Sequence, residues 1–166
     1  CILESINDSN VLHINDISSK KYLQLKKDFN SKVASISCKD ASFEKFPMAD
    51  KILLDVPCSA TGTIQKNPDI KWKNQDLEKI NILQLKILKN MSKFLNSNGT
   101  IVYSTCSLNK RENFKLIDMF LKENKNFSLD DASKFIDKKY VKNKCLSIFP
   151  PKHKLEGMFA ARLVKS

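Results

Sequence analysis

The sequence lacks an apolar run of membrane-spanning length, and it has neither a C-x-x-C pair nor regularly spaced cysteines. A membrane helix needs about 20 consecutive apolar residues, and the amino terminus has no basic-then-apolar secretion pattern, so we expect a cytoplasmic protein. Its five cysteines are odd in number and scattered, which argues against a disulfide framework and a structural zinc site. We therefore expect reduced thiols and no bound metal.

What the chain has in excess is positive charge. Its formal net charge is +11 and its pI is near 9.4, which favours a polyanionic partner because lysines that neutralise phosphates release condensed counterions. Lysines that only solubilise the surface explain the charge equally well. With 166 residues and 42% hydrophobic composition, the chain is expected to form one monomeric domain over residues 1–166.

Apolar residues occur at both strand and helix spacings along the chain, which predicts an α/β fold. Pro57 should end its strand because proline cannot donate to a ladder. Asn98-Gly99 should end the helix before it. The predicted strands are 11–14, 32–38, 51–55, 100–104, 145–149 and 158–164. One predicted helix starts at Ser18 or Ser19, and two further helices cover 76–95 and 111–122.

Two cysteines directly follow buried strands of this pattern. Cys58 lies in Asp55-Val-Pro-Cys-Ser-Ala-Thr-Gly62, and Cys106 lies in Tyr103-Ser-Thr-Cys-Ser107. A strand, a crossover helix and a second strand normally form a right-handed parallel unit. Since parallel strands end at one sheet edge, where α/β folds bind ligands, we expect the two thiols to meet over one substrate.

Two thiols and a carboxylate suit covalent chemistry on a cytosine ring. A positioned thiolate can add to carbon 6, which makes carbon 5 nucleophilic toward a methyl donor, and a second group can then help the first sulfur to leave. Asp55 could stabilise a proton on ring nitrogen 3. The plainer alternatives are that Asp55 only caps its turn and that either cysteine alone is a buried, inert thiol.

The segments Asp55 to Gly62, Asn67-Pro-Asp-Ile-Lys-Trp72 and Tyr103 to Ser107 followed by Glu112-Asn113 resemble the signature segments of RNA (cytosine-5) methyltransferases. The similarity is greatest to the bacterial Sun or RsmB branch, which modifies small-subunit ribosomal RNA, and extends from about Asp16 to the terminal strand. It implies a Rossmann-like class I S-adenosylmethionine-dependent methyltransferase sheet.

The resemblance also assigns roles to the site residues. Cys106 matches the family's nucleophile and Cys58 the cysteine that assists release, whereas the DNA cytosine-5 enzymes would reverse these roles. Asp16, Asp40 and Asp55 match the residues that bind S-adenosylmethionine, Asp16 through both ribose hydroxyls. Asp16 could instead be a helix-start residue, and Asp40 an ordinary loop aspartate.

The family's Pro-Gly-Gly-Lys-Thr-like segment has no counterpart, because the only glycines are Gly62, Gly99 and Gly157. The resemblance therefore implies a partial methyltransferase catalytic domain, truncated at its amino end, without its first strand and glycine-rich loop. We expect the isolated chain to bind S-adenosylmethionine poorly.

The loop after Cys58 could contact RNA. Lys66, Lys71, Trp72 and Lys73 could receive an extruded base and its phosphates, although anchoring of Trp72 in the core is the favoured alternative. The lysines between 138 and 154 could track an RNA backbone or form a solvated face. Two other functions remain open: a non-catalytic RNA-binding or ribosome-assembly module, and a methyltransferase acting on an exocyclic amine, whose expected motif differs from Asp55-Val-Pro-Cys58.

Overall fold

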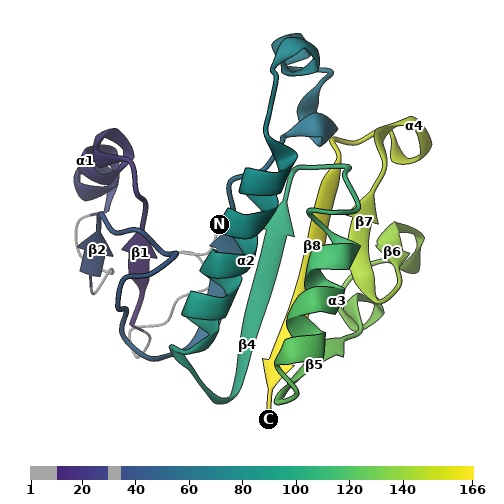
Figure 1. Ribbon diagram of the computed structural model, residues 1–166. Helices are drawn as coiled ribbons and strands as arrows, with labels where there is room; N and C mark the ends of the chain where they lie inside the picture. Colours follow the sequence, from purple (N-terminus) through teal and green to yellow (C-terminus); the bar gives the residue numbers. More distant parts are fainter. Residues whose placement is uncertain (1–10, 30–34) are drawn as a thin grey trace. The chain divides into compact units, whose positions relative to one another are not determined.

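The computed structural model describes residues 11–29 and 35–166 (Figure 1). The chain divides into two compact units, Cys1–Glu44 and Lys45–Ser166. The expectation of a single domain over residues 1–166 stays a prediction. In the described part of the chain, no helix is long and apolar enough to cross a membrane.

The first unit has a strand, a helix and a strand, as its sequence predicts. β1 (His13–Asn15) and β2 (Ser35–Ser37) pair in parallel, and α1 (Ser19–Asp28) lies between them in sequence. The Ser18 side chain accepts a hydrogen bond from Lys21 N, which satisfies a backbone donor that the first helical turn leaves free. The predicted residues 32–34 of the second strand lie outside the described residues.

The second unit is built on a six-stranded mixed sheet in the order β3-β4-β8-β7-β6, with β5 also pairing with β8. β3 and β4 are parallel, and the other pairings are antiparallel. The strands are β3 (Ala49–Asp55), β4 (Leu95–Thr105), β5 (Phe127–Asp130), β6 (Val141–Lys142), β7 (Cys145–Ile148) and β8 (Met158–Lys165).

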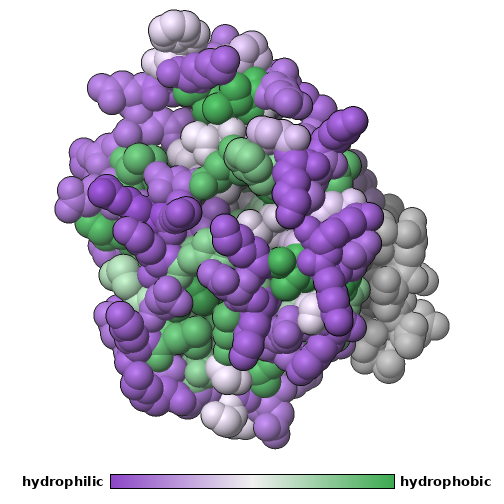
Figure 2. Space-filling model, turned by 90° about the vertical axis from the view of Figure 1, so that its right-hand side faces the viewer, coloured by the Kyte–Doolittle hydropathy of each residue, from purple (hydrophilic) through white to green (hydrophobic). Residues whose placement is uncertain are grey.

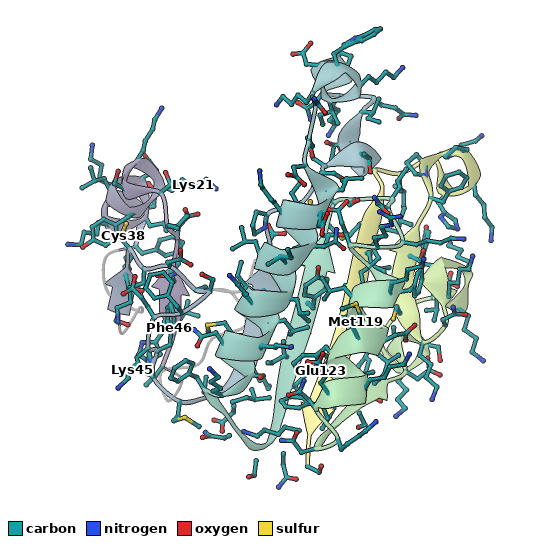
Figure 3. The ribbon with its side chains drawn as sticks, viewed as in Figure 1. Lys21, Cys38, Lys45, Phe46, Met119 and Glu123 are labelled. Atoms are coloured by element: carbon teal, nitrogen blue, oxygen red, sulfur yellow. The ribbon has the colours of Figure 1, made fainter. Side chains whose placement is uncertain are left out.

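Two helices cover one face of this sheet. In Figure 1, α2 (Leu77–Ser92) and α3 (Phe114–Glu123) lie on the viewer's side of the sheet, α2 to the left of β4 and α3 to its right. An ion pair joins Lys89 of α2 to Glu123 of α3, which Figure 3 labels. Side chains alternate across a strand, so every second residue is buried in β4 from Gly99 onward and in β8 from Phe159 to Leu163. The buried residues include Ile101, Tyr103, Phe159, Ala161 and Leu163.

The crossover from β3 through α2 to β4 confirms the predicted parallel unit. The predicted helix end at 95 and the predicted strand start at 100 are both misplaced, because α2 ends at Ser92 and β4 already begins at Leu95. Leu95 has helical spacing in the sequence, but it pairs with Ala49 and therefore belongs to the sheet. The left-handed residue is Asn98, with φ 61°, and not Gly99.

Shorter elements complete the unit. They are η2 (Thr61–Thr63), η3 (Pro68–Trp72), η4 (Ala132–Lys134), η5 (Lys138–Tyr140) and α4 (Pro150–His153). Hydrophilic side chains cover much of the face shown in Figure 2, with hydrophobic side chains between them in small groups. The predicted strands 145–149 and 158–164 are confirmed as β7 and β8, and the α/β prediction holds.

Candidate active site

The sulfur atoms of Cys58 and Cys106 lie 3.3 Å apart. Cys106 directly follows β4, and Cys58 comes three residues after Asp55, the last residue of β3. Asp55 pairs with Ser104, and Val56 N donates to Ser104 O at 3.2 Å, so the two parallel strands end side by side. The expectation that two thiols would meet at one sheet edge is confirmed, and both are partly exposed.

A buried carboxylate ties the two cysteine segments together. Glu112, fully buried, accepts hydrogen bonds on Oε2 from Ser59 N at 2.8 Å and Gln84 Nε2 at 3.1 Å. Its Oε1 accepts from Ser59 Oγ at 2.5 Å and Ser107 Oγ at 2.6 Å. Ser59 and Ser107 each follow one of the two cysteines. Glu112 therefore connects the two cysteine segments through these hydrogen bonds.

Tyr103 fixes the turn that carries Glu112, because its hydroxyl donates a hydrogen bond to the Glu112 backbone carbonyl at 2.8 Å. Burial raises the pKa of Tyr103, and the charge of Glu112 raises it further, so the hydroxyl remains protonated as a donor. Asn113 links the other end of the turn, since it accepts from Thr105 Oγ1 at 2.7 Å and donates to Ser107 O at 2.8 Å.

Two glycines let three backbone segments meet beside the thiols. Gly62 N donates to Cys106 O at 2.8 Å, and Gly157 N donates to Gly62 O at 2.9 Å. A Cβ on Gly62 would lie 2.5 Å from Gly157 O and 2.7 Å from Cys106 O. Both would be contacts with backbone atoms, so only glycine fits without moving the Cys106 loop.

We expect Gly62→Ala to lower the free energy of unfolding by about 2–3 kcal/mol, because the added methyl group overpacks this crossing. Thermal or urea unfolding measures the change. Ala60→Gly is the control: Ala60 has φ 56°, a left-handed conformation that glycine adopts more easily. It should unfold at or slightly above the wild-type temperature. Equal stabilities for Gly62→Ala and the wild type would contradict the close approach.

The Cys106 thiol is protonated at neutral pH. Its pKa is raised to about 12, first by burial, then by the hydrogen bond and charge of Cys58, and last by the charge of Asp55. Each of these influences disfavours the thiolate. Bound substrate or a proton acceptor must therefore help to remove this proton before the sulfur can attack a carbon atom.

We expect Cys106 to react slowly with iodoacetamide at pH 8 and faster as the pH rises, since a raised pKa leaves little thiolate. Removing Cys58 with Cys58→Ala eliminates two causes of the shift, so Cys106 in that variant should react several-fold faster at pH 8. Mass spectrometry of labelled peptides measures each cysteine separately. Labelling of wild-type Cys106 as fast as exposed Cys38 at pH 8 would refute this prediction.

Asp55 has an exposed carboxylate at the end of β3, and within the described residues no hydrogen bond or ion pair engages it. Its negative charge helps to raise the pKa of Cys106, so the two groups lie in one electrostatic environment. The alternative that Asp55 caps the following turn would require a side-chain hydrogen bond, and none is found in the described part of the chain. The carboxylate is free to contact a substrate or cofactor.

Asp16 and Asp40 belong to the first unit, where each follows one of the two parallel strands. Asp16 accepts from Ser18 N at 2.8 Å and pairs with Lys21 Nζ at 3.2 Å, the contacts of a helix-start residue; Figure 3 labels Lys21. Asp40 Oδ1 accepts from Ser42 N at 2.8 Å. Their positions at one end of a parallel pair fit nucleotide-binding carboxylates, and their cofactor role stays a prediction.

The favoured prediction for Trp72, burial in the core, is wrong. Its side chain is 87% exposed at the end of η3. The turn holds itself through backbone hydrogen bonds, Ile70 N to Asn67 O and Lys73 N to Ile70 O, so it needs no apolar anchor. Lys66 on the same loop forms an ion pair with Glu156.

Glu112 lies in a signature segment of the sequence, but no role is predicted for it there. The signal that could have found it is a carboxylate and an amide, Glu112-Asn113, directly before the apolar helix α3.

In the part of the chain that the structure describes, no group of three or more His, Cys, Asp or Glu residues could hold a metal ion.

The sequence model of the family described as 16S rRNA methyltransferase RsmB/F matches residues 2–164. The chain is 40% identical to the ribosomal RNA small subunit methyltransferase B of Shewanella oneidensis over 119 residues, 70% of this chain and 27% of that protein. Identity to the protein of the same name from Photorhabdus laumondii is 40% over 120 residues, 70% of this chain and 26% of that protein.

Among solved structures, NSun6 from Pyrococcus horikoshii, determined with SFG, superimposes with a TM-score of 0.82 at 26% identity. The match covers 99% of this chain and 44% of that one. The fold is accordingly the Rossmann-like methyltransferase fold that the sequence predicted. The chain spans about a quarter of the length of the curated relatives it matches. With nearly all of its residues matched by the family's sequence model, the chain belongs to the 16S rRNA methyltransferase RsmB/F family.

Proposed function

We propose that this chain carries the catalytic residues of an S-adenosylmethionine-dependent enzyme that methylates carbon 5 of a cytosine in RNA, with small-subunit ribosomal RNA as substrate. The observation that carries the proposal is the pair of sulfur atoms 3.3 Å apart, Cys58 and Cys106, at two adjacent parallel strand ends. The curated relatives, named as small-subunit ribosomal RNA methyltransferases, support the choice of substrate.

In the proposed reaction Cys106 loses its proton and its sulfur bonds to carbon 6 of the cytosine. The electron pair of the 5,6 double bond moves so that carbon 5 becomes nucleophilic and takes a methyl group. A base then removes the proton from carbon 5, the double bond re-forms, and the bond between Cys106 sulfur and carbon 6 breaks. Cys58, in contact with the Cys106 sulfur, assists this release.

Asp55 is proposed to hold a proton at ring nitrogen 3 while the adduct forms. Its exposed carboxylate stands at the end of β3, and its charge reaches Cys106. A carboxylate at this point offsets the negative charge that the ring would otherwise accumulate, by sharing a proton with it.

S-adenosylmethionine would supply the electrophilic methyl group and would be left as the neutral thioether S-adenosylhomocysteine. Asp16 is proposed to accept hydrogen bonds from both ribose hydroxyls, and Asp40 and Asp55 are proposed to bind the cofactor as well, as the resemblance implies. Asp16 and Asp40 follow two parallel-paired strands of the first unit, the arrangement by which α/β folds bind nucleosides.

The test uses the protein expressed from its complete gene. It is incubated with unmodified small-subunit ribosomal RNA and S-adenosylmethionine carrying a labelled methyl group, and the product nucleosides are separated by mass spectrometry. Label in 5-methylcytidine is the expected result. Label in an N-methylated nucleoside instead would overturn the proposed chemistry, and RNA binding without any methyl transfer would favour the non-catalytic RNA-binding module.

A further inference from the structure

The turn η3, on the segment that follows Cys58, places an indole ring in water. Trp72 is the only tryptophan of the chain, and its side chain is 87% exposed. The segment that carries it, between β3 and α2, projects above the upper end of β4 in Figure 1, where the Cys106 segment begins. An exposed ring at this position is available to a partner.

Short hydrogen bonds tie this turn to the candidate active site. Thr63 Oγ1 donates to Ala60 O at 2.9 Å, and Asn67 N donates to Thr63 O at 2.9 Å. Gly62, between Ala60 and Thr63, donates its N–H to Cys106 O at 2.8 Å. The ring is therefore presented on a segment whose root is hydrogen-bonded to the backbone of Cys106, which keeps the cost of ordering it on binding low.

A lysine precedes Trp72 in the sequence and another follows it. Lys71 and Lys73 are exposed, and within residues 11–29 and 35–166 neither forms an ion pair. Lys66, nearer the root of the loop, is paired with Glu156. The tip of the loop thus combines one aromatic face with two unpaired positive charges.

This combination fits a nucleotide better than a protein. Protein interfaces need an extended apolar core and are depleted of lysine, yet Trp72 is the only exposed large hydrophobic residue between Cys58 and Asp76. Unpaired RNA bases stack on aromatic side chains, and lysines contact the phosphates on either side. We propose that Trp72 stacks on an unpaired RNA base next to the target cytosine, while Lys71 and Lys73 contact the adjoining phosphates. The inference rests on the proposed RNA substrate and adds a specific contact to it.

The test measures binding, so it does not depend on methyl transfer. The protein from the complete gene, as wild type, Trp72→Ala and Trp72→Phe, is titrated with a single-stranded oligonucleotide of small-subunit ribosomal RNA sequence and followed by fluorescence anisotropy. Trp72→Ala should weaken binding roughly ten-fold or more, and Trp72→Phe should restore much of the loss because it keeps a stacking face. Phe135→Ala, which removes another exposed ring that lies against Arg162, should bind like the wild type.

Two further measurements separate stacking from charge. The difference in tryptophan fluorescence between wild type and Trp72→Phe should be quenched by the oligonucleotide. Lys71→Ala and Lys73→Ala should each reduce the slope of log affinity against log salt by about 0.7. Unchanged RNA affinity in Trp72→Ala, or loss of affinity only for a ribosomal protein, would overturn the inference. Intact RNA stacking without methyl transfer would instead refute the proposed function alone.

Discussion

Replacing Cys106 with alanine is expected to abolish methyl transfer to RNA, because it removes the sulfur that is proposed to bond to carbon 6, and the Cys58 sulfur lies 3.3 Å from that position. Loss of a covalent nucleophile typically lowers the rate by several orders of magnitude. The measurement is incorporation of labelled methyl groups into ribosomal RNA by the protein from its complete gene. Cys38→Ala, which removes an exposed thiol of the first unit, should retain full activity.

Cys58→Ala should behave differently from Cys106→Ala. If Cys58 assists release, its loss leaves the bond between Cys106 and carbon 6 intact, and a covalent protein–RNA species should accumulate that survives denaturing electrophoresis. Finding the adduct with Cys106→Ala and not with Cys58→Ala would reverse the two roles, as in the DNA enzymes. An active Cys106→Ala enzyme would rule out the assignment altogether.

Replacing Glu112 with alanine is expected to be strongly destabilising. It leaves Ser59 N as a buried donor without an acceptor, and Gln84 Nε2 loses one of its two acceptors while keeping Pro57 O. Each loss costs about 1–3 kcal/mol, so we expect a loss of at least about 2 kcal/mol in total. Because Ser59 and Ser107 follow the two cysteines, methyl transfer should fall as well. Thermal unfolding and the methylation assay measure the two effects.

Glu112→Gln separates shape from charge. The amide oxygen can still accept from Ser59 N and Gln84, and its NH₂ can donate to the hydroxyls of Ser59 and Ser107, which can rotate to accept. We expect a smaller loss, about 1 kcal/mol. Glu123→Ala, which removes a half-exposed carboxylate paired with Lys89, should change stability by less than about 1 kcal/mol. If Glu112→Ala unfolds at the same temperature as Glu123→Ala, the supporting role of Glu112 is disproved.

The thiol pair could be predicted because its cause is local. Each cysteine closely follows an apolar run, and a parallel unit brings two such ends together whatever packs around them. The boundaries were harder, since residues 93–95 have helical spacing, yet Lys93 and Phe94 form a turn and Leu95 pairs with Ala49 in the sheet.

The polar support of the site could not be predicted in the same way. Donors to Glu112 come from the segment after β3, from α2 and from the segment after β4, so its role depends on tertiary packing that no short pattern encodes. Trp72 was misjudged for a related reason. A tryptophan is usually buried, but η3 is closed by its own backbone hydrogen bonds and leaves the ring outside.

The contact between Gly62 and Gly157 has a consequence for biosynthesis. Gly157 immediately precedes β8, the strand that β4, β5 and β7 all pair with. A nascent polypeptide that ends before this point has both cysteines but neither the central strand nor the glycine that braces their loops. The reactive pair can thus reach its final geometry only after residues 157–165 have emerged during translation.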